Sequence, residues 1–232
     1  MVLDGLNLTI ESQKITVIIG RSGGGKSVLL KHMIGLVKPD AGRILVDGTD
    51  ITALKGAELN EIRKNFGMLF QDAALFDSMN VGENVAFPIK EHRRLAKKEV
   101  QRIITDKLLE VGLSGVTHKM PSELSGGMRK RVGLARALAL DPKIILFDEP
   151  TTGLDPIMCD AIDRLIVETQ KNTHATCVVI SHDIESTFKI AHKVAMLYKG
   201  KIIAYGSPEE IKTSSNPVLR QFIEGKYNPE NS

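Results

Sequence analysis

The sequence predicts an α/β fold with a mainly parallel sheet, an inserted all-helical subdomain and antiparallel β elements. Short apolar runs that suit buried strands alternate with longer helical patterns along most of the chain. Residues 80–141 depart from this alternation, because they show helical periodicity and no strand pattern. Two β-rich runs joined by Lys199-Gly200 indicate an antiparallel hairpin near the end of the chain.

The expected strands are short apolar segments bounded by turn signals. They are Ile15–Ile19, Arg43–Val46, Phe66–Phe70, Ile144–Phe147, Cys177–Ile180, Val194–Tyr198 and Lys201–Tyr205. The expected helices are one that follows Lys26 and ends at Gly35, one over Lys97–Val111 and one over Gly126–Leu140. We therefore expect a single domain over residues 1–232, with a core of residues 1–79 and 142–232 and a helical subdomain at 80–141.

Composition narrows the classes of function. The formal net charge is +3, from 31 basic and 28 acidic residues, which is too balanced to support nucleic-acid binding. Two cysteines, Cys159 and Cys177, cannot form a disulfide framework, and both are expected to be inert core residues in a reducing compartment. No run reaches the roughly 18 apolar residues of a membrane span, and no signal peptide is evident, so a cytoplasmic protein is expected.

A glycine-rich segment between the first strand and the first helix carries the strongest functional signal. It matches the P-loop pattern G-x-x-x-x-G-K-[ST] in the strand–loop–helix context that the pattern requires, which disfavours a chance glycine-rich turn. Such a loop turns its backbone amides toward phosphate oxygens at a helix N-terminus. The expected ATP-binding residues are Gly20, Arg21, Ser22, Gly23, Gly24, Gly25, Lys26 and Ser27, followed by Val28 on the helix. Lys26 would contact the β- and γ-phosphates, and the Ser27 hydroxyl would bind Mg²⁺.

Two carboxylates follow the apolar strand Ile144–Phe147. Asp148 at the end of a buried strand suits a Mg²⁺ ligand, bound directly or through water. Glu149 is then placed to polarise a water for attack on the γ-phosphate. The alternative, that both residues cap the next loop, is disfavoured beside a P-loop.

The segment Leu124–Met128 (sequence LSGGM) resembles the LSGGQ signature of ABC ATPases, with Met in the last place. Ser125 is expected to cap the next helix, and the glycines to expose its first amides. In that family the helix end faces the γ-phosphate bound by another subunit. The resemblance thus implies that Ser125, Gly126 and Gly127 bind ATP across a head-to-tail dimer of two copies.

Three further positions match the family in their order along the chain. Gln71 resembles the Q-loop glutamine, which senses Mg²⁺ and the membrane part of the transporter, and Gly153–Asp155 resembles the D-loop, which communicates across the dimer. His182 resembles the switch histidine that contacts the γ-phosphate. As isolated residues, Gln71 and His182 would be interpreted as ordinary polar side chains. The resemblance instead places Gln71 and Asp155 at the nucleotide.

The resemblance also assigns the chemistry. It implies that Lys26, Glu149 and His182 carry catalysis, with Glu149 activating water and His182 stabilising charge in the transition state. It implies that Ser27, Gln71 and Asp148 hold Mg²⁺.

The beginning of the chain departs from the family pattern. ABC ATPases usually have a strand, and an aromatic residue that stacks on adenine, before the stretch that matches Val2–Gly5. Because this chain starts directly on that stretch, we hypothesise a missing N-terminal strand and a weakened contact to adenine.

A sub-family is indicated by residues 70–88 and by the segment Arg220–Gly225. Both are similar to the ATPases of bacterial Mla-type lipid transport systems, which work with MCE-domain proteins. This similarity implies a transmembrane permease and an MCE-domain lipid-binding protein as partners, phospholipid as the cargo, and a place on the cytoplasmic face of the inner membrane. Two alternatives stay open: the ATPase of another importer or exporter, for example for amino acids, and a regulatory ABC module without transport.

The segment after Gln71 is expected to form the groove that receives a helix of the permease. The apolar candidates for that contact are Phe76, Met79, Val81 and Phe87. Ordinary packing within the helical subdomain is the alternative for these residues, and it is stronger for Phe87 than for Phe76.

Overall fold

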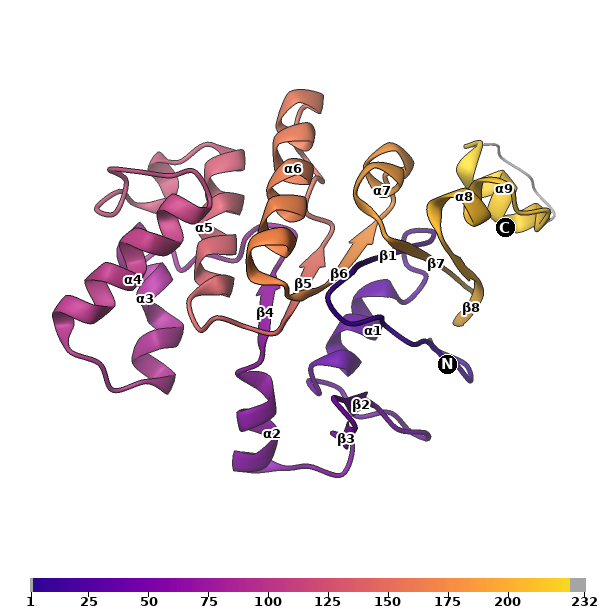
Figure 1. Ribbon diagram of the computed structural model, residues 1–232, viewed down its shortest axis with the longest axis horizontal. Helices are drawn as coiled ribbons and strands as arrows, with labels where there is room; N and C mark the ends of the chain where they lie inside the picture. The colour runs from indigo at the N-terminus through magenta and orange to yellow at the C-terminus, as the bar shows by residue number, and fades with distance from the viewer. Residues whose placement is uncertain (1, 226–232) are drawn as a thin grey trace.

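The structure, a computed structural model, describes residues 2–225 (Figure 1). Its main sheet has six strands in the order β4-β5-β6-β1-β7-β8. These strands are β1 Ile15–Ile19, β4 Phe66–Leu69, β5 Ile144–Asp148, β6 Thr176–Ser181, β7 Lys193–Tyr198 and β8 Lys201–Gly206. Neighbouring strands are parallel except β7 and β8, which form an antiparallel hairpin. A separate two-stranded hairpin consists of β2 Leu45–Val46 and β3 Thr49–Asp50.

Strand β1 is the centre of the sheet, since it pairs with β6 on one side and β7 on the other. All of its side chains are buried, and they alternate between the two faces of the sheet. Ile15, Val17 and Ile19 join the larger hydrophobic cluster, whereas Ile18 joins the smaller cluster on the opposite face. The continuous apolar run is therefore what a strand buried on both faces requires.

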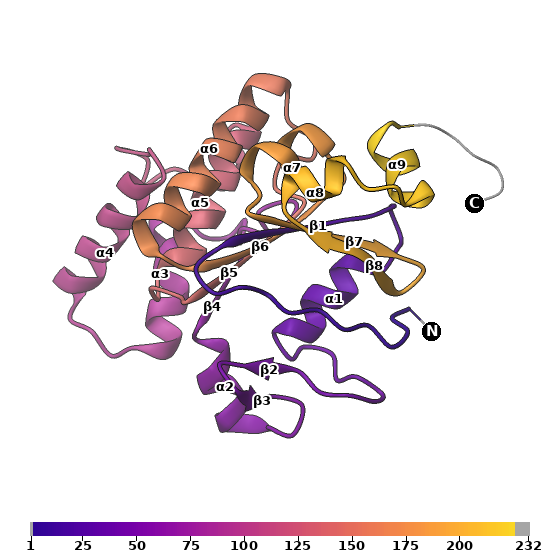
Figure 2. The ribbon, with the colours of Figure 1, turned by 45° about the vertical axis from the view of Figure 1, so that its right-hand side comes forward.

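Helices cover both faces of this sheet. Helices α5, α6 and α7 lie on one face and α1 on the other (Figures 1 and 2). The helices are α1 Lys26–Met33, α2 Gly56–Arg63, α3 Val81–His92, α4 Lys97–Glu110, α5 Gly126–Leu138, α6 Pro156–Thr173, α7 Ile184–Ile190, α8 Pro208–Lys212 and α9 Pro217–Ile223. A short 3₁₀ turn at Pro121–Glu123 precedes α5.

Helices α3, α4 and α5 pack against one another beside the β4 edge of the sheet (Figure 1). Helix α3 begins at a capping box, in which Asn80 accepts from the Glu83 N–H and the Glu83 side chain accepts from the Asn80 N–H. Helix α5 approaches β4 closely, because a Cβ at Gly67 would lie 2.5 Å from the Ala137 carbonyl oxygen. This glycine lets the helical region dock directly on the sheet.

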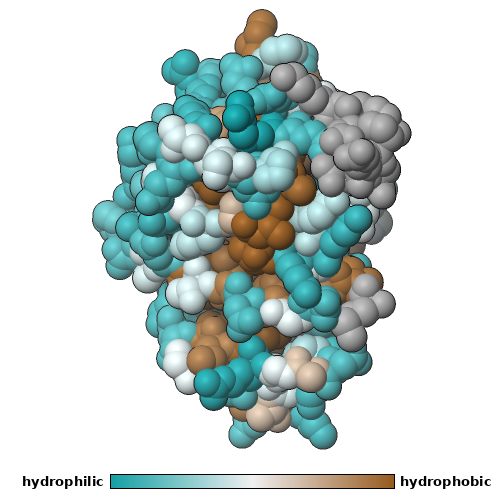
Figure 3. Space-filling model, turned by 90° about the vertical axis from the view of Figure 1, so that its right-hand side faces the viewer, coloured by the Kyte–Doolittle hydropathy of each residue, from teal (hydrophilic) through white to brown (hydrophobic). Residues whose placement is uncertain are grey.

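The opposite end of the molecule carries β8, α8 and α9. Hydrophilic side chains cover most of this face, and a hydrophobic group interrupts them near its middle (Figure 3). Across residues 2–225, none of the helices combines the length and the apolar character that a bilayer crossing needs.

Most predicted elements are present, with shifted ends. The strand expected at Arg43–Val46 is wrong in its first half, because only Leu45 and Val46 are paired. The helix expected to reach Leu140 ends at Leu138, since Asp141 takes a left-handed φ of 55° and Pro142 follows. The helices outside residues 80–141 that have no counterpart in the predictions are α2, α6, α7, α8 and α9.

Two predictions about single side chains are also corrected. Val81 is fully buried at the start of α3, so it belongs to the core and cannot face a partner. Cys177 is buried as expected, but Cys159 is half-buried on α6 rather than in the core.

A buried carboxyl group joins α6 to α7. Asp163 is 3% exposed, and its Oδ2 accepts a hydrogen bond of 2.7 Å from the Ser186 hydroxyl. Its Oδ1 has no hydrogen-bond partner among the described residues. The pKa of Asp163 is raised to about 6, chiefly by burial and also by the charges of Asp183 and Glu185, while the Ser186 hydrogen bond acts in the opposite direction.

This environment predicts a stabilising substitution with a pH signature. The folded chain keeps the Asp163 proton to a higher pH than the unfolded chain, so stability falls as pH rises from the ordinary pKa of 3.8 to about 6. Asp163→Asn should therefore raise the free energy of unfolding by about 1–3 kcal/mol near neutral pH and by less below about pH 5. Urea denaturation at both pH values measures this, with Asp160→Asn on the same helix as control. A gain independent of pH would contradict the interpretation.

Candidate nucleotide-binding site

The loop after β1 is shaped by close backbone contacts. A Cβ at Gly20 would lie 2.4 Å from the Leu197 carbonyl oxygen on β7, so no larger residue fits there. The Gly24 N–H donates to the Arg21 carbonyl at 3.1 Å, which turns the chain back on itself. Gly25 has a left-handed φ of 95° directly before α1. The result is a tight loop that ends at a helix N-terminus, which is the arrangement that binds phosphate.

Lys26 is held inside this loop. Its side chain is buried, and its Nζ donates to the Gly20 carbonyl at 2.9 Å and the Arg21 carbonyl at 3.0 Å. The Glu149 Oε1 atom lies 3.8 Å from the same Nζ. Burial lowers the pKa of Lys26, and the charges of Glu149 and Asp148 act in the opposite direction. The ammonium group is therefore positioned at the loop before any phosphate arrives.

Ser27 and Asp148 bring two oxygen ligands together. The Ser27 hydroxyl donates to Asp148 Oδ1 at 3.3 Å, and burial raises the pKa of that carboxyl. Hydroxyl and carboxylate oxygens suit Mg²⁺, which completes its shell with water and substrate phosphates. Within residues 2–225 no group of three or more His, Cys, Asp or Glu side chains could hold a metal ion. The residues present thus fit a Mg²⁺ that is bound together with phosphate, and not by protein ligands alone.

Glu149 occupies the centre of the cluster. Its side chain is 18% exposed, and its Oε2 lies 3.3 Å from His182 Nδ1. The Thr152 hydroxyl donates to the same Oε2 at 3.2 Å. The backbone of Glu149 is left-handed, with φ of 48°, and its N–H donates to the Ile180 carbonyl of β6 at 3.0 Å. A non-glycine residue in this conformation is strained, so the surrounding turn must hold it.

Two further predicted residues follow strands at the same edge of the sheet. His182 comes directly after β6 and is half exposed. Gln71 follows β4 after Phe70 and is exposed. Since parallel strands end at one edge, the carboxyl ends of β1, β5, β6 and β4 all supply predicted site residues.

The signature segment forms the start of α5. Ser125 is the N-cap, and its hydroxyl accepts from the Met128 N–H at 3.3 Å. Gly127 is buried, and a Cβ there would overlap the end of the Met158 side chain. Asp155 is likewise an N-cap, since its Oδ1 accepts from the N–H groups of Ile157 and Met158 at 3.0 Å each. Both side chains therefore satisfy the first amides of their own helices.

The single chain therefore assembles part of the predicted site. Lys26, Ser27, Asp148, Glu149 and His182 are linked by the contacts given above. Ser125 and Asp155 are used as helix caps and are not bonded to this cluster. Their helices, α5 and α6, begin apart from α1 in both ribbon views (Figures 1 and 2).

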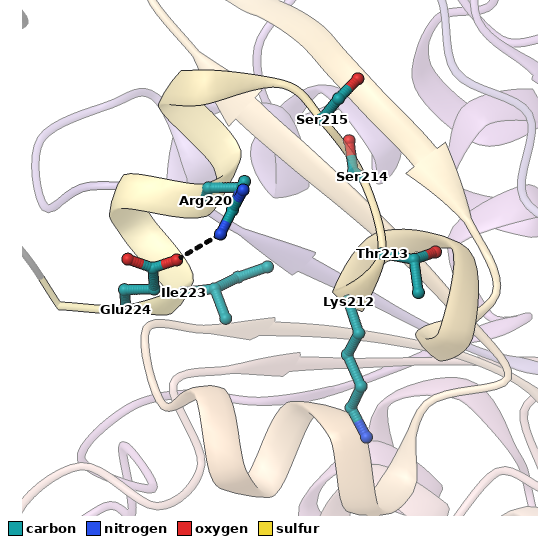
Figure 4. Close-up of a pocket in the computed structure, with 7 residues that line it drawn as sticks. All are labelled: Lys212, Thr213, Ser214, Ser215, Arg220, Ile223 and Glu224. Carbon is teal, nitrogen blue, oxygen red and sulfur yellow. Dashed lines mark hydrogen bonds and ion pairs between the residues drawn. The ribbon is translucent and has the colours of Figure 1, made fainter.

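A separate pocket of about 540 Å³ lies between α8 and α9 (Figure 4). Arg220 and Glu224 form a salt bridge of 3.1 Å in its wall. None of its lining residues belongs to the predicted nucleotide site. Both polar and apolar groups line this pocket, and it is not part of the nucleotide site.

Thr152 was missed by the sequence interpretation, although its hydroxyl contacts the Glu149 carboxylate. Lys130 was missed as well; it is a buried lysine on α5 whose Nζ contacts the turn after Glu149. A charged residue on the apolar side of a helical pattern was the available signal for Lys130. The sequence around Thr152 carried no such signal, because Thr152 contacts the Glu149 carboxylate only through the left-handed turn at Glu149.

Comparison with known families and structures agrees with this geometry. The family model for ABC transporters matches residues 3–152. Among curated proteins, the chain is 46% identical over 96% of its length to the probable ribonucleotide transport ATP-binding protein mkl of Mycobacterium tuberculosis. It is also 46% identical over 97% of its length to the intermembrane phospholipid transport system ATP-binding protein MlaF of Haemophilus influenzae. The chain spans 62% of the mycobacterial protein and 86% of the Haemophilus protein.

Solved structures share the fold. The cbiO1 protein of Clostridium perfringens, described as part of the ABC transporter complex cbiONQ, superposes with a TM-score of 0.85 at 32% identity, covering 95% of this chain and 87% of that one. The ATP-binding cassette MJ0796, in a dimeric post-hydrolysis state with ADP and Pi, gives 0.82 at 30% identity, covering 89% and 90%. The chain belongs to the ABC transporter family and has the fold of its nucleotide-binding ATPase subunits.

The position of Lys26 predicts its contribution to binding. Lys26→Met should weaken ATP binding by about 10–100-fold, because a charge-assisted hydrogen bond to phosphate is lost. Titration with a fluorescent ATP analogue measures the affinity. Lys98→Met, which removes an exposed lysine from α4, is the control and should bind normally. Equal affinities for the two variants would contradict the assigned role of Lys26.

Proposed function

We propose that this chain is the ATP-hydrolysing subunit of a bacterial ABC transporter that moves phospholipid through a partner permease and an MCE-domain protein. The observation that carries the catalytic part is the position of the Glu149 carboxylate, between Lys26 of the phosphate loop and His182. A carboxylate held at that point suits a base for water that attacks the γ-phosphate. In this proposal, residues 80–141 form the helical subdomain, and residues 1–79 and 142–232 the core.

Binding begins at the phosphate loop. The amides of residues 20–28, which include Ser22, Gly23 and Val28, surround the phosphates, and Lys26 exchanges its two carbonyl partners for phosphate oxygens. Ser27 and Asp148 would hold Mg²⁺ together with Gln71, which follows the end of β4. When bound, Mg²⁺ neutralises charge on the β- and γ-phosphates.

Hydrolysis then depends on Glu149 and His182. The Glu149 carboxylate accepts a proton from the attacking water, while Thr152 holds the carboxylate in place. The water oxygen bonds to the γ-phosphorus as the bond to the oxygen that bridges the β- and γ-phosphates breaks, and ADP leaves. The negative charge that develops is stabilised by Lys26 and by His182, whose half-exposed ring can turn toward the γ-phosphate.

A second copy completes the site in this proposal. One chain leaves the Ser125–Gly127 helix end and the Asp155 turn outside its own catalytic cluster. Helix N-termini with exposed amides attract phosphate, so these groups would serve the nucleotide of a partner copy in head-to-tail arrangement. The similar cassette MJ0796 was solved as a dimer, which supports this assembly.

The segment after Gln71 is a surface suited to the permease. Phe76 is 41% exposed, stacks on Phe87 with ring centroids 4.8 Å apart, and lies 5.9 Å from the Arg136 guanidinium. Arg136 also donates to the Ala73 and Ala74 carbonyls at 2.7 Å each. This rigid, partly apolar surface begins five residues after Gln71, so a change at the nucleotide can reach it directly.

The cargo and location are proposed from the relatives. The MlaF protein of Haemophilus influenzae is named for intermembrane phospholipid transport, and the chain spans most of that relative. The mycobacterial relatives are named for ribonucleotide transport, but the chain spans less of their length. We therefore place the chain on the cytoplasmic face of the inner membrane, in a phospholipid system. Lipid analysis of the purified transporter decides between the two cargos.

The catalytic assignment predicts a trapped state. Glu149→Gln should lower ATP turnover by at least about 100-fold, because the base is lost, and should leave a stable ATP-bound dimer. Light scattering of the variant with Mg-ATP measures the dimer, and phosphate release measures turnover. Glu168→Gln, on the exposed side of α6, is the control. A monomeric variant, or one with normal turnover, would sink the proposed role of Glu149.

The partner surface predicts a loss of assembly. Phe76→Glu should prevent co-purification with a co-expressed permease and MCE-domain protein, because a charge would be buried against apolar groups. Leu109→Glu, at another exposed apolar residue on α4, should assemble normally. Recovery of a complete complex with the Phe76 variant counts against the proposed permease surface. Recovery of the unmodified chain with a permease but without an MCE-domain protein counts against the proposed MCE-domain partner.

A further inference from the structure

Lys130 is a buried lysine in the middle of the helix that begins with the signature segment. Its exposure is 5%, and it lies on the side of α5 that faces the turn after β5. Its Nζ donates to the Pro150 carbonyl at 2.5 Å and to the Thr152 carbonyl at 2.9 Å. Both acceptors belong to the turn that starts with Glu149.

This ammonium group is buried without a carboxylate partner. Among the described residues, both of its hydrogen bonds go to main-chain carbonyls, and no ion pair includes it. Burial lowers the pKa of Lys130, although the charges of Asp72, Cys159 and Glu149 favour its protonated form. A buried cation is costly for the fold, so an apolar residue would serve packing better at this position. What a lysine adds is a pair of strong donors at the end of a long side chain.

The two carbonyls belong to the turn that sets the geometry of Glu149. Within this turn the Thr152 N–H donates to the Glu149 carbonyl at 3.2 Å, and the Thr152 hydroxyl donates to the Glu149 carboxylate at 3.2 Å. Glu149 itself has the left-handed φ of 48°. Such a conformation persists only where neighbouring groups impose it. Lys130 supplies two hydrogen bonds that do so from outside the turn.

The same helix carries the signature segment. Ser125 caps α5, and Gly127 packs against Met158 in the first turn of α6. Lys130 follows one turn later and joins α5 to the strand end that bears Glu149. The Lys130 side chain thus connects the helix of the signature segment to the turn that carries the catalytic carboxylate of the same subunit.

We propose that Lys130 is a positioning residue for ATP hydrolysis, which holds the turn of Glu149 against the signature helix. This inference rests on the proposed function of Glu149 as the base. In a head-to-tail dimer, the helix that closes on the nucleotide of one site would then control the carboxylate of the other site. Closure of the dimer around one nucleotide is thereby transmitted to Glu149 at the second nucleotide site.

The first test separates rate from binding. Lys130→Met should lower kcat for ATP by about 10–100-fold, because a small misplacement of the base slows the chemical step, with little change in KM. Lys130→Arg keeps charged donors and should recover part of the kcat lost in Lys130→Met, but not all of it, because the larger planar guanidinium fits this buried position less well. Lys107→Met, which removes a partly buried lysine from α4, is the control and should retain kcat. A normal kcat for Lys130→Met, or equal losses for Lys130→Met and Lys107→Met, overturns the proposal.

The second test asks whether Lys130 acts through Glu149. In a Glu149→Gln background, adding Lys130→Met should change the residual single-turnover rate by less than about twofold, since coupled residues are not additive. A general loss of folding would lower the rate in both backgrounds and would overturn the inference. Lys130→Gln, a shorter neutral donor, replaces Lys130→Met in both tests if the methionine variant is insoluble.

The proposed ATPase function and the positioning role of Lys130 can fail separately. If the unmodified chain binds ATP but does not hydrolyse it with Mg²⁺, the proposed function fails, and this inference fails with it. If the unmodified chain hydrolyses ATP and the Glu149→Gln variant does not, a Lys130→Met variant with normal kcat removes the inference alone.

Discussion

Parallel hydrogen bonding between β5, β6 and β1 is the constraint on which the site depends. The shared register places Asp148 opposite Ile180, and Ile19 opposite Ser181, so the phosphate loop, the acidic pair and His182 all leave the sheet at one edge. None of these segments is near another in the sequence. The buried, apolar strands make the register specific, because a slip of one residue would turn core side chains to the wrong face.

Charge burial is concentrated around that edge. Lys26 and Lys130 are both almost fully buried, and each uses main-chain carbonyls as hydrogen-bond acceptors. In the proposed function Lys26 exchanges its carbonyls for phosphate oxygens, whereas Lys130 bonds to the turn that starts with Glu149. The two buried lysines therefore have different proposed roles. Lys26 binds a ligand, and Lys130 stabilises a strained backbone turn.

Helix α5 connects the parts of the molecule that act together. It packs on β4 through Gly67, holds the segment after Gln71 through Arg136, and holds the Glu149 turn through Lys130. Its N-terminus presents Ser125 to the outside. A rigid helix with these contacts would transmit a displacement at any one of them to the others, which suits the proposed transfer of nucleotide closure to a membrane partner.

The amino-acid pattern alone sufficed for the α/β class, the central strands, the phosphate loop and the two carboxylates, because those features are local: an apolar run, a glycine pattern and a strand end. The position of Lys26 beside the acidic pair depended instead on the order of the strands, in which β6 lies between β1 and β5. The α6 helix, the exact ends of β2 and α5, and the burial of Val81 depended on packing between distant segments. Thr152 and Lys130 emerged only from the folded chain, because their role comes from the left-handed turn at Glu149 and the approach of α5 to it, and neither is encoded in local spacing.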